Sequence, residues 1–319
     1  MTDRQIECIV AIAEQQSLTN AAKLLYVSQS SLSQLLSKVE TELNTQLFIR
    51  TGSAMLPTYA GRQVLESVQE ISSIKRNLYM RLNDASRPNE GQIRIGIAPR
   101  RSYLFMPVVL SSFMKEFPGA EIELIEEDQK LLEEMVLQGK VDIAFIVHPS
   151  VCQHLKYQYL YREPISLALP KDSALSEPFS AQTTADLSLA ANMPFILVRR
   201  GHDIRRLCEQ AFSDAHIVPN VLLESHSMDV CLQMAANGLG ATIVPDTLVA
   251  MHPQQSKVIC YPLGDKYSRE IAIAYREDVY LSHIHREFIR VAAQQIVETF
   301  GAPGRRRAPE KKEPTDQSC

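Results

Sequence analysis

The sequence predicts an all-α N-terminal domain, then one long helix, then an α/β region. Three observations predict this order. Residues 1–57 contain short apolar-periodic segments with no obvious strand, and residues 58–88 form a single long helical pattern. From Gly91 to about residue 300, strand and helix signals alternate, which is typical of a sheet covered by helices. A chain of 319 residues has room for two or three such domains.

The composition excludes several classes of protein. With 45% hydrophobic and 22% charged residues the chain can build apolar cores, so global disorder is excluded. Six cysteines spread along the chain exclude a disulfide-dense small fold. The formal net charge of −4 excludes a uniformly basic coat but leaves room for a local DNA-binding surface. The start lacks the apolar core of a signal peptide and no segment is apolar enough to cross a bilayer, so we expect a cytoplasmic protein.

The first domain carries the pattern of a helix-turn-helix. A first helix places apolar residues of 6–13 on one face, and a short second helix covers Asn20–Leu25. Ser28 or Ser30 can then cap a third helix that runs to Val39. Two helices joined by a tight turn, the second opening with polar residues, are typical of this motif.

The outer face of the third helix carries hydrogen-bonding side chains long enough to reach base edges in a major groove. After this helix, the apolar segment 47–49 precedes Arg50, which places a cation where a wing could meet the DNA backbone. We therefore expect DNA contacts from Thr19, Ser28, Gln29, Ser30, Ser31, Ser33, Gln34, Lys38, Arg50 and Thr51. The alternative is a small helical bundle whose polar residues are only solvated. Charge does not decide between them, because residues 1–65 hold five basic and five acidic residues.

Together these motifs resemble the LysR-type transcriptional regulators. The matching segments, in order, are Ala21-Ala22, Val27-Ser28-Gln29, Leu32-Ser33, Val39-Glu40-Thr41-Glu42-Leu43 and Leu47-Phe48-Ile49-Arg50. The resemblance covers residues 1 to about 300 and implies a winged helix-turn-helix, 1–57, that binds DNA. Two positions depart from the family pattern: Ser30 stands where proline is usual, and Gln34 stands where arginine or lysine is common.

The long helix, 58–88, has one apolar stripe on an otherwise polar surface. The stripe repeats every 3.6 residues on average and consists of Val64, Val68, Ile71, Ile74, Leu78 and Leu82. It could dock on its own domain. The resemblance implies instead that it pairs with the same helix of a second subunit. A homodimer or homotetramer would then present two recognition helices to a palindromic promoter site.

The α/β region, 89–300, contains two sets of strand and helix signals. The resemblance implies a two-lobed effector domain with the type-2 periplasmic-binding-protein fold. We place lobe I at about 91–162 and 268–300 and lobe II at about 163–267, with the chain crossing between them near Tyr161–Pro164 and Gly264–Ser268. Residues 301–319 lack an apolar pattern and are expected to form a disordered tail.

Three expected strand ends carry polar side chains. Open parallel sheets bind ligands at the carboxyl ends of their strands, and guanidinium groups bind carboxylate or phosphate in a fork geometry. We therefore expect a small anionic effector to contact Arg100, Arg101, Ser102, His148, Arg199 and His202. Adjacent side chains cannot all face one ligand, so only one or two of Arg100, Arg101, Arg199 and Arg200 should matter. The others could face solvent or pair with Glu126, Glu127 or Asp128.

No catalytic motif is present, so we expect no enzyme activity, no metal and no cofactor. His283 and His285 are two positions apart on an expected helix and so lie on different faces. We interpret the chain as a sequence-specific transcriptional regulator whose partners are double-stranded DNA, a carboxylate or phosphate effector and a second copy of itself. RNA polymerase is a further candidate partner, and no membrane is expected. The alternative is a cytoplasmic small-molecule-binding or interaction protein of the same fold that has lost DNA binding.

Overall fold

The computed structural model describes residues 1–301 apart from 53, 149–151, 153, 172 and 180–182. The expected disordered tail, 301–319, therefore falls almost wholly outside the described residues. Contacts divide the chain into two units, one holding Met1–Arg87 and the other holding Pro88–Leu137 and the chain from Val141 onward.

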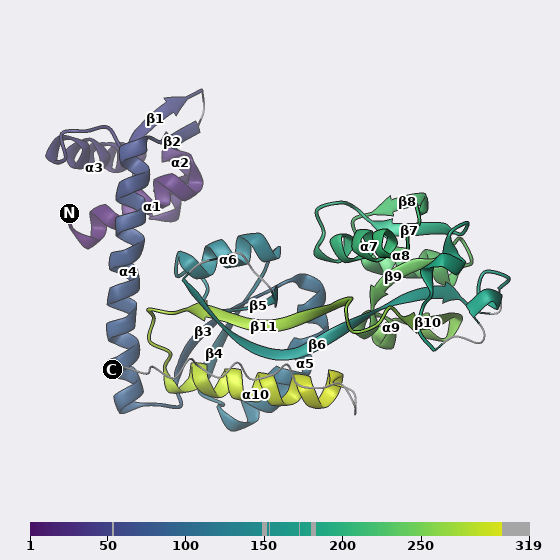
Figure 1. The fold of residues 1–319 in the computed structure, drawn as a ribbon. Helices are drawn as coiled ribbons and strands as arrows, with labels where there is room; N and C mark the ends of the chain where they lie inside the picture. The colour runs from purple at the N-terminus through teal and green to yellow at the C-terminus, as the bar shows by residue number, and fades with distance from the viewer. Residues whose placement is uncertain (53, 149–151, 153, 172, 180–182, 302–319) are drawn as a thin grey trace, which may run out of the picture. The chain divides into compact units, whose positions relative to one another are not determined.

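Three helices open the first unit: α1 (Asp3–Gln15), α2 (Leu18–Leu24) and α3 (Gln29–Glu42) (Figure 1). Each begins at a capping side chain. The hydroxyls of Thr2, Ser17 and Ser28 accept hydrogen bonds from backbone N–H groups of the first turn, which the helix itself cannot satisfy. The inward faces share one core, which includes Ile9, Ile12, Ala21, Leu32, Leu36 and Val39. The predicted helix-turn-helix is thus formed by α2 and α3.

A two-stranded hairpin follows α3, in which β1 (Phe48–Thr51) runs antiparallel to β2 (Ala54–Pro57). The sequence showed no obvious strand here, because strands of four residues are too short for a clear alternation. The carboxylate of Glu40 on α3 accepts hydrogen bonds from the N–H groups of Leu47, at 2.7 Å, and Phe48, at 3.2 Å. This contact ties the hairpin, which is the wing, to the third helix.

The long helix is α4 (Tyr59–Ser86), capped by Thr58. A Cβ atom on Gly61 would lie 2.0 Å from the carbonyl oxygen of Leu47, so only glycine lets the helix approach the wing this closely. The apolar stripe divides into two parts. Val64 and Val68 are partly or fully buried, and Val64 packs on the core of the first unit. The remaining members, Ile71, Ile74, Leu78 and Leu82, are 51–69% exposed.

The first lobe of the second unit is a mixed sheet with helices on both faces. Its strand β3 (Gly91–Ile97) lies between β4 (Ala120–Glu126) and β5 (Ile143–His148) and is parallel to both. Its helices are α5 (Pro99–Glu116), α6 (Gln129–Leu137) and α10 (His283–Phe300) (Figure 1). Helices α5 and α10 pack on one face around Phe113 and Phe288. Helix α6 packs on the other face through Leu132 and Val136.

Two long antiparallel strands join the lobes. β6 (Leu155–Pro170) pairs with β11 (Ser268–Arg276) from Pro164 opposite Ser268 to Leu155 opposite Arg276. β11 also pairs with β5, whereas the last part of β6 pairs with β9 (Thr242–Pro245) and β10 (Val258–Pro262). Tyr161–Pro164 lies within β6, and Gly264–Ser268 leads into β11, so the segments expected to cross between the lobes belong to or adjoin these paired strands (Figure 1).

The second lobe adds a parallel pair, β7 (Pro194–Val198) with β8 (Asn220–Ser225). Its helices are α7 (Asp203–Asp214), α8 (Met228–Ala236) and α9 (Asp246–Met251), with short 3-10 turns at 177–179, 187–190 and 255–257. The core includes Phe179, Phe195, Phe212 and Tyr261. The sequence analysis did not anticipate α9 or β10, both of which are short.

One boundary differs in a way that affects the expected effector site. Arg100, Arg101 and Ser102 were expected just after the end of a strand, but helix α5 already begins at Pro99. Proline suits the first helical position because its φ is preset and its missing N–H is not needed there. Arg100, Arg101 and Ser102 therefore lie in the first turn of a helix, not in a loop. None of the helices among the described residues is long and apolar enough to cross a membrane.

Candidate DNA-binding and effector sites

Helix α3 separates an apolar inner face from a polar outer face. Leu32, Leu36 and Val39 are buried in the core of the first unit. The outer face exposes Gln29, Ser30, Ser31, Gln34 and Lys38, while Ser33 is half-buried. Because the inner face already holds the helix in place, the exposed amides, hydroxyls and ammonium group remain available to a partner.

Side chains at the start of α3 also organise one another. The Ser28 hydroxyl caps the helix and lies 2.9 Å from the hydroxyl of Ser30 and 2.7 Å from that of Ser31. The Thr19 hydroxyl donates to Oε1 of Gln29 at 3.1 Å. This hydrogen bond fixes the amide of Gln29 and leaves its NH2 group as the outward donor.

The wing supplies an exposed cation. Arg50 and Thr51 lie in β1, and both are exposed. Within the described part of the chain, neither Arg50 nor Lys38 forms an ion pair. Both charges are therefore free to meet a phosphate.

The two strands that join the lobes carry a buried charge cluster. Arg269 of β11 donates from Nε to Glu163 of β6 at 2.8 Å and from a terminal nitrogen to Asp203 of α7 at 2.7 Å. Glu163 also accepts from the hydroxyls of Thr247, on α9, and Tyr161. The side chains of Arg269 and Glu163 are only 5% and 4% exposed. The cluster thus links both joining strands to α7 and α9 of the second lobe.

The charges of this cluster stabilise one another. Burial alone would raise the pKa of Glu163, but Arg269 and Arg101 outweigh it and hold this pKa below its usual range. Burial would also raise the pKa of Asp203, but Arg269 and His202 outweigh it and hold this pKa well below its usual value. Both carboxylates are therefore ionised at neutral pH.

Arg101, in the first turn of α5, is the cation of this cluster without a direct partner. Among the residues that the structure describes, its guanidinium makes no hydrogen bond or ion pair. Burial and the neighbouring charge of Arg269 lower the pKa of Arg101, while Glu163 and Asp203 oppose this shift. A guanidinium stays protonated in proteins, so Arg101 remains a cation beside this cluster.

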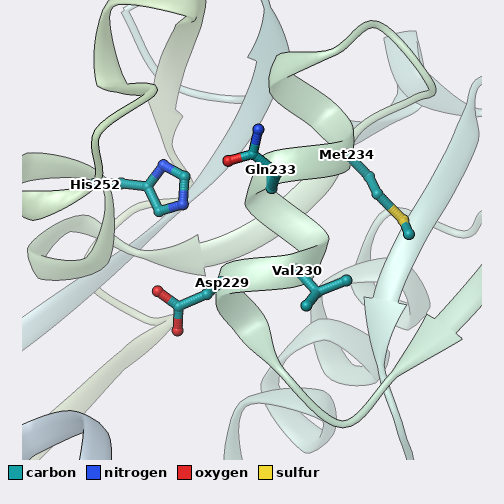
Figure 2. Close-up of a pocket in the computed structure, with 5 residues that line it drawn as sticks. All are labelled: Asp229, Val230, Gln233, Met234 and His252. Atoms are coloured by element: carbon teal, nitrogen blue, oxygen red, sulfur yellow. The ribbon is translucent and has the colours of Figure 1, made fainter.

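Arg100 is neutralised by an acid of the other lobe. Its guanidinium pairs with Asp229 at the start of α8, and not with Glu126, Glu127 or Asp128. Asp229 lines an open pocket of about 320 Å³ together with Val230, Gln233, Met234 and His252. Figure 2 shows Asp229 and Gln233, one helical turn apart on α8, extending towards the His252 ring.

The other expected effector residues are distributed around the lobes. Arg199 is exposed and lies 2.8 Å from a ring nitrogen of His226. Nδ1 of His202 lies 2.6 Å from Asp203, which brings it to the buried charge cluster. Ser102 is buried in α5 at 6% exposure. The side chain of His148 lies outside the described residues, although its backbone pairs with Glu270.

Sequence reasoning missed Glu163, Asp203, Arg269 and Asp229. For Glu163 and Arg269 a signal existed, because each lies beside a long apolar strand pattern and a charge buried there requires a partner. Asp203 and Asp229 occupy first turns of helices, where acidic residues are common for reasons of helix stability alone. Nothing in the sequence distinguished these two from ordinary helix starts.

A second buried ion pair lies in the first lobe. Asp142 accepts from the backbone N–H of Arg94 at 2.8 Å and from two nitrogens of its guanidinium, at 3.2 and 2.6 Å. His285 of α10 lies 3.7 Å from Asp142, and its other ring nitrogen lies 2.7 Å from the Ser282 hydroxyl. This set ties α10 to β3. No group of three His, Cys, Asp or Glu side chains suited to a metal occurs in the part of the chain that the structure describes.

The second lobe also buries two cysteines. Burial raises the pKa of the Cys208 thiol to about 12 and that of Cys231 to about 11. Both thiols are therefore protonated at neutral pH and are poor nucleophiles.

Two family models match this chain. The model described as a bacterial regulatory helix-turn-helix protein of the lysR family matches residues 4–62, and the LysR substrate binding domain matches residues 86–296. An uncharacterized HTH-type transcriptional regulator, YcgK of Bacillus subtilis, is 28% identical over 94% of this chain and 96% of its own length. The regulator CzcR of the same organism is 28% identical over 91% of this chain and 96% of its own.

Solved structures share the fold. A full-length OxyR variant from Pseudomonas aeruginosa matches with a TM-score of 0.70 and 23% identity, over 93% of this chain and 97% of that chain. Full-length CbnR in complex with its target DNA matches with a TM-score of 0.65 and 21% identity, over 92% of this chain and 100% of that one. These matches extend across the helix-turn-helix, the long helix and the two-lobed unit.

Proposed function

Because this chain belongs to the LysR family of bacterial transcriptional regulators, we propose that it binds a specific DNA site through α3 and the wing and that a small anion bound between its lobes controls this activity. The family consists of transcriptional regulators and not of enzymes. We propose further that the chain acts as a homodimer or homotetramer in the cytoplasm, on a palindromic promoter site, with RNA polymerase as a further partner.

The exposed polar face of α3 carries the DNA-binding proposal. A recognition helix must present hydrogen-bonding groups at its N-terminal end while its inner face stays packed. The Gln29 amide meets this condition, because Thr19 holds its oxygen and leaves its NH2 group free for a base edge. Ser30, Ser31, Ser33 and Gln34 continue the same polar face, and Thr19, Ser28, Lys38, Arg50 and Thr51 complete the proposed contact set.

The variant Gln29→Ala tests this proposal. We expect it to reduce the preference for DNA from upstream of the protein's own gene over a scrambled duplex by roughly tenfold, the size of a good base contact. Fluorescence anisotropy with both duplexes measures this preference. Ser37→Ala is the matched control, because Ser37 is an exposed serine on the same helix outside the proposed contact set. An unchanged preference in Gln29→Ala would exclude α3 as the reader of the sequence.

Arg101 carries the effector proposal. It is the one cation of the buried cluster whose guanidinium has no partner among the described residues, and it lies beside His202 and Asp203 at the start of α7. A carboxylate or phosphate would pair with this guanidinium in a charge-assisted fork. Ser102, His148, Arg199 and Arg100 are the further proposed contacts, and Arg100 must first leave Asp229.

Calorimetry with a panel of carboxylates and phosphates tests the effector proposal. We expect at least one member of the panel to bind the wild-type protein and Arg101→Ala to weaken it about 10- to 100-fold, because a hydrogen bond to a charged group is lost from a poorly solvated site. Arg206→Ala is the control, because it removes an exposed arginine of α7. Equal binding by wild type and Arg101→Ala would remove the anion argument.

A further inference from the structure

Tyr26 occupies a backbone position that disfavours its side chain. Helix α2 ends in a Schellman motif, in which the Val27 N–H donates to the carbonyl of Ala22 at 3.0 Å and the Tyr26 N–H donates to that of Lys23 at 3.2 Å. This geometry places Tyr26 in the left-handed region, at φ +54°. Glycine or asparagine is usual there, because a bulky side chain is strained at positive φ.

The folded first unit gains nothing from the Tyr26 ring. The residue is 97% exposed, and its hydroxyl has no hydrogen-bond partner among the described residues. Val27, by contrast, packs on the core and completes the motif. Tyr26 therefore has both a strained backbone and an exposed ring, and neither stabilises the folded unit.

The location of Tyr26 suggests what the ring does. It lies two residues before Ser28, the cap of α3, at the end of the helix where Gln29, Ser30 and Ser31 are exposed. The phosphate backbone flanks the N-terminus of a recognition helix when that helix enters a major groove. A phenol is a neutral donor of suitable length for a phosphate oxygen.

We propose that the Tyr26 hydroxyl donates a hydrogen bond to a DNA phosphate and so positions α3 in the major groove. This inference rests on the proposed DNA binding and adds a contact outside its set of residues. A phosphate contact carries no sequence information, so Tyr26 should support binding to all duplexes alike. Because a neutral donor displaces no condensed cation, its loss should leave the salt dependence unchanged.

Anisotropy titrations of the full-length protein test the contact. We expect Tyr26→Phe to weaken binding to the upstream duplex and to the scrambled duplex by the same factor, roughly three- to tenfold, which is the value of one hydrogen bond. The slope of log K against log salt should stay that of the wild type. Arg50→Ala should instead lower this slope by about one unit. Tyr103→Phe is the control, because it removes a phenol that is 73% exposed in the second unit.

The variant Tyr26→Gly gives a second, opposite readout. Removing the strain should slow amide hydrogen exchange in α2 and α3 of the full-length protein by roughly fivefold, while DNA binding weakens at least as much as in Tyr26→Phe. A purely structural role predicts that stability and affinity change together.

Two outcomes would overturn the inference. If Tyr26→Phe and Tyr26→Gly both bind DNA as tightly as the wild type, the phosphate contact is excluded and the proposed function is unaffected. A wild-type protein that binds neither duplex would overturn the proposed function and the contact with it.

Discussion

Single residues show where this chain places its charges and why. The second unit holds two largely buried carboxylate–guanidinium pairs, Glu163 with Arg269 and Asp142 with Arg94. Breaking a buried pair leaves an unpaired charge, which costs several kcal/mol, about 3 to 5. Exposed pairs such as Arg290 with Glu116 contribute less than about 1 kcal/mol. Removing one partner of a buried pair should therefore destabilise this unit more than removing one partner of an exposed pair.

The Asp142 pair predicts a specific pH dependence. Burial raises the pKa of Asp142, but His285 and Arg94 outweigh it, so the folded pKa lies below the unfolded value of about 3.9. The Asp142 carboxylate therefore stabilises the fold fully at pH values above its unfolded pKa. This stabilisation is lost as the pH falls through the lower folded pKa. We expect Asp142→Asn to lower the free energy of unfolding by about 3 kcal/mol at pH 7 and by much less at an acidic pH below the folded pKa of Asp142.

Urea denaturation at both pH values, followed by circular dichroism, measures this difference. Glu116→Gln is the matched control, because it breaks an exposed pair and should change stability by less than about 1 kcal/mol at pH 7. A destabilisation by Asp142→Asn that is equal at the two pH values would show that the carboxylate charge is not what matters.

The sequence predicts the helices and strands that have a long, regular repeat of apolar residues and misses those that lack one. The 28 residues of α4, with a stripe every 3.6 residues, could be predicted, but among the strands of the α/β region β6 and β10 could not. The four-residue strands of the wing and the short α9 could not be predicted either, because they are held by contacts such as Glu40 with the wing backbone. The start of α5 was missed because Pro99 was interpreted as the end of a strand.

The same limit applies to the candidate sites. The outer face of α3 follows from helical spacing alone, so the predicted DNA-contact set could be drawn up without a structure. The expected effector residues came from three expected strand ends. Arg100 pairs with Asp229, whereas Arg101 lies near Glu163 and its cluster. Because these partners come from distant segments of the chain, the sequence alone could not predict the difference.

The exposed part of α4 predicts a subunit interface. Ile71, Ile74, Leu78 and Leu82 leave a long apolar stripe in water, whereas Val64 and Val68 are covered by the chain itself. A symmetric pair of such helices would bury the stripe. We expect Leu78→Asp to shift the protein to monomers in sedimentation velocity and to weaken DNA binding at least tenfold, because two half-sites would no longer be bound together. Ser72→Asp adds the same charge on the polar face and should remain oligomeric.

The two units of the whole molecule have different proposed roles. The first unit holds α3, proposed to read the DNA sequence, together with a wing cation and the exposed stripe. The second holds two lobes joined by β6 and β11, with a buried charge cluster at the junction. An effector can change DNA binding only if it prefers one of two assembled states, so anion binding at Arg101 must be linked to lobe geometry.

We propose above all that this chain reads a DNA sequence. The most direct measurement is anisotropy of the full-length protein on DNA from upstream of its own gene, with a scrambled competitor and at two salt concentrations. We predict binding that resists the competitor and a shallow salt dependence, because Gln34 stands where arginine or lysine is common in the family pattern. Binding equal to that of scrambled DNA at both salt concentrations would contradict the account.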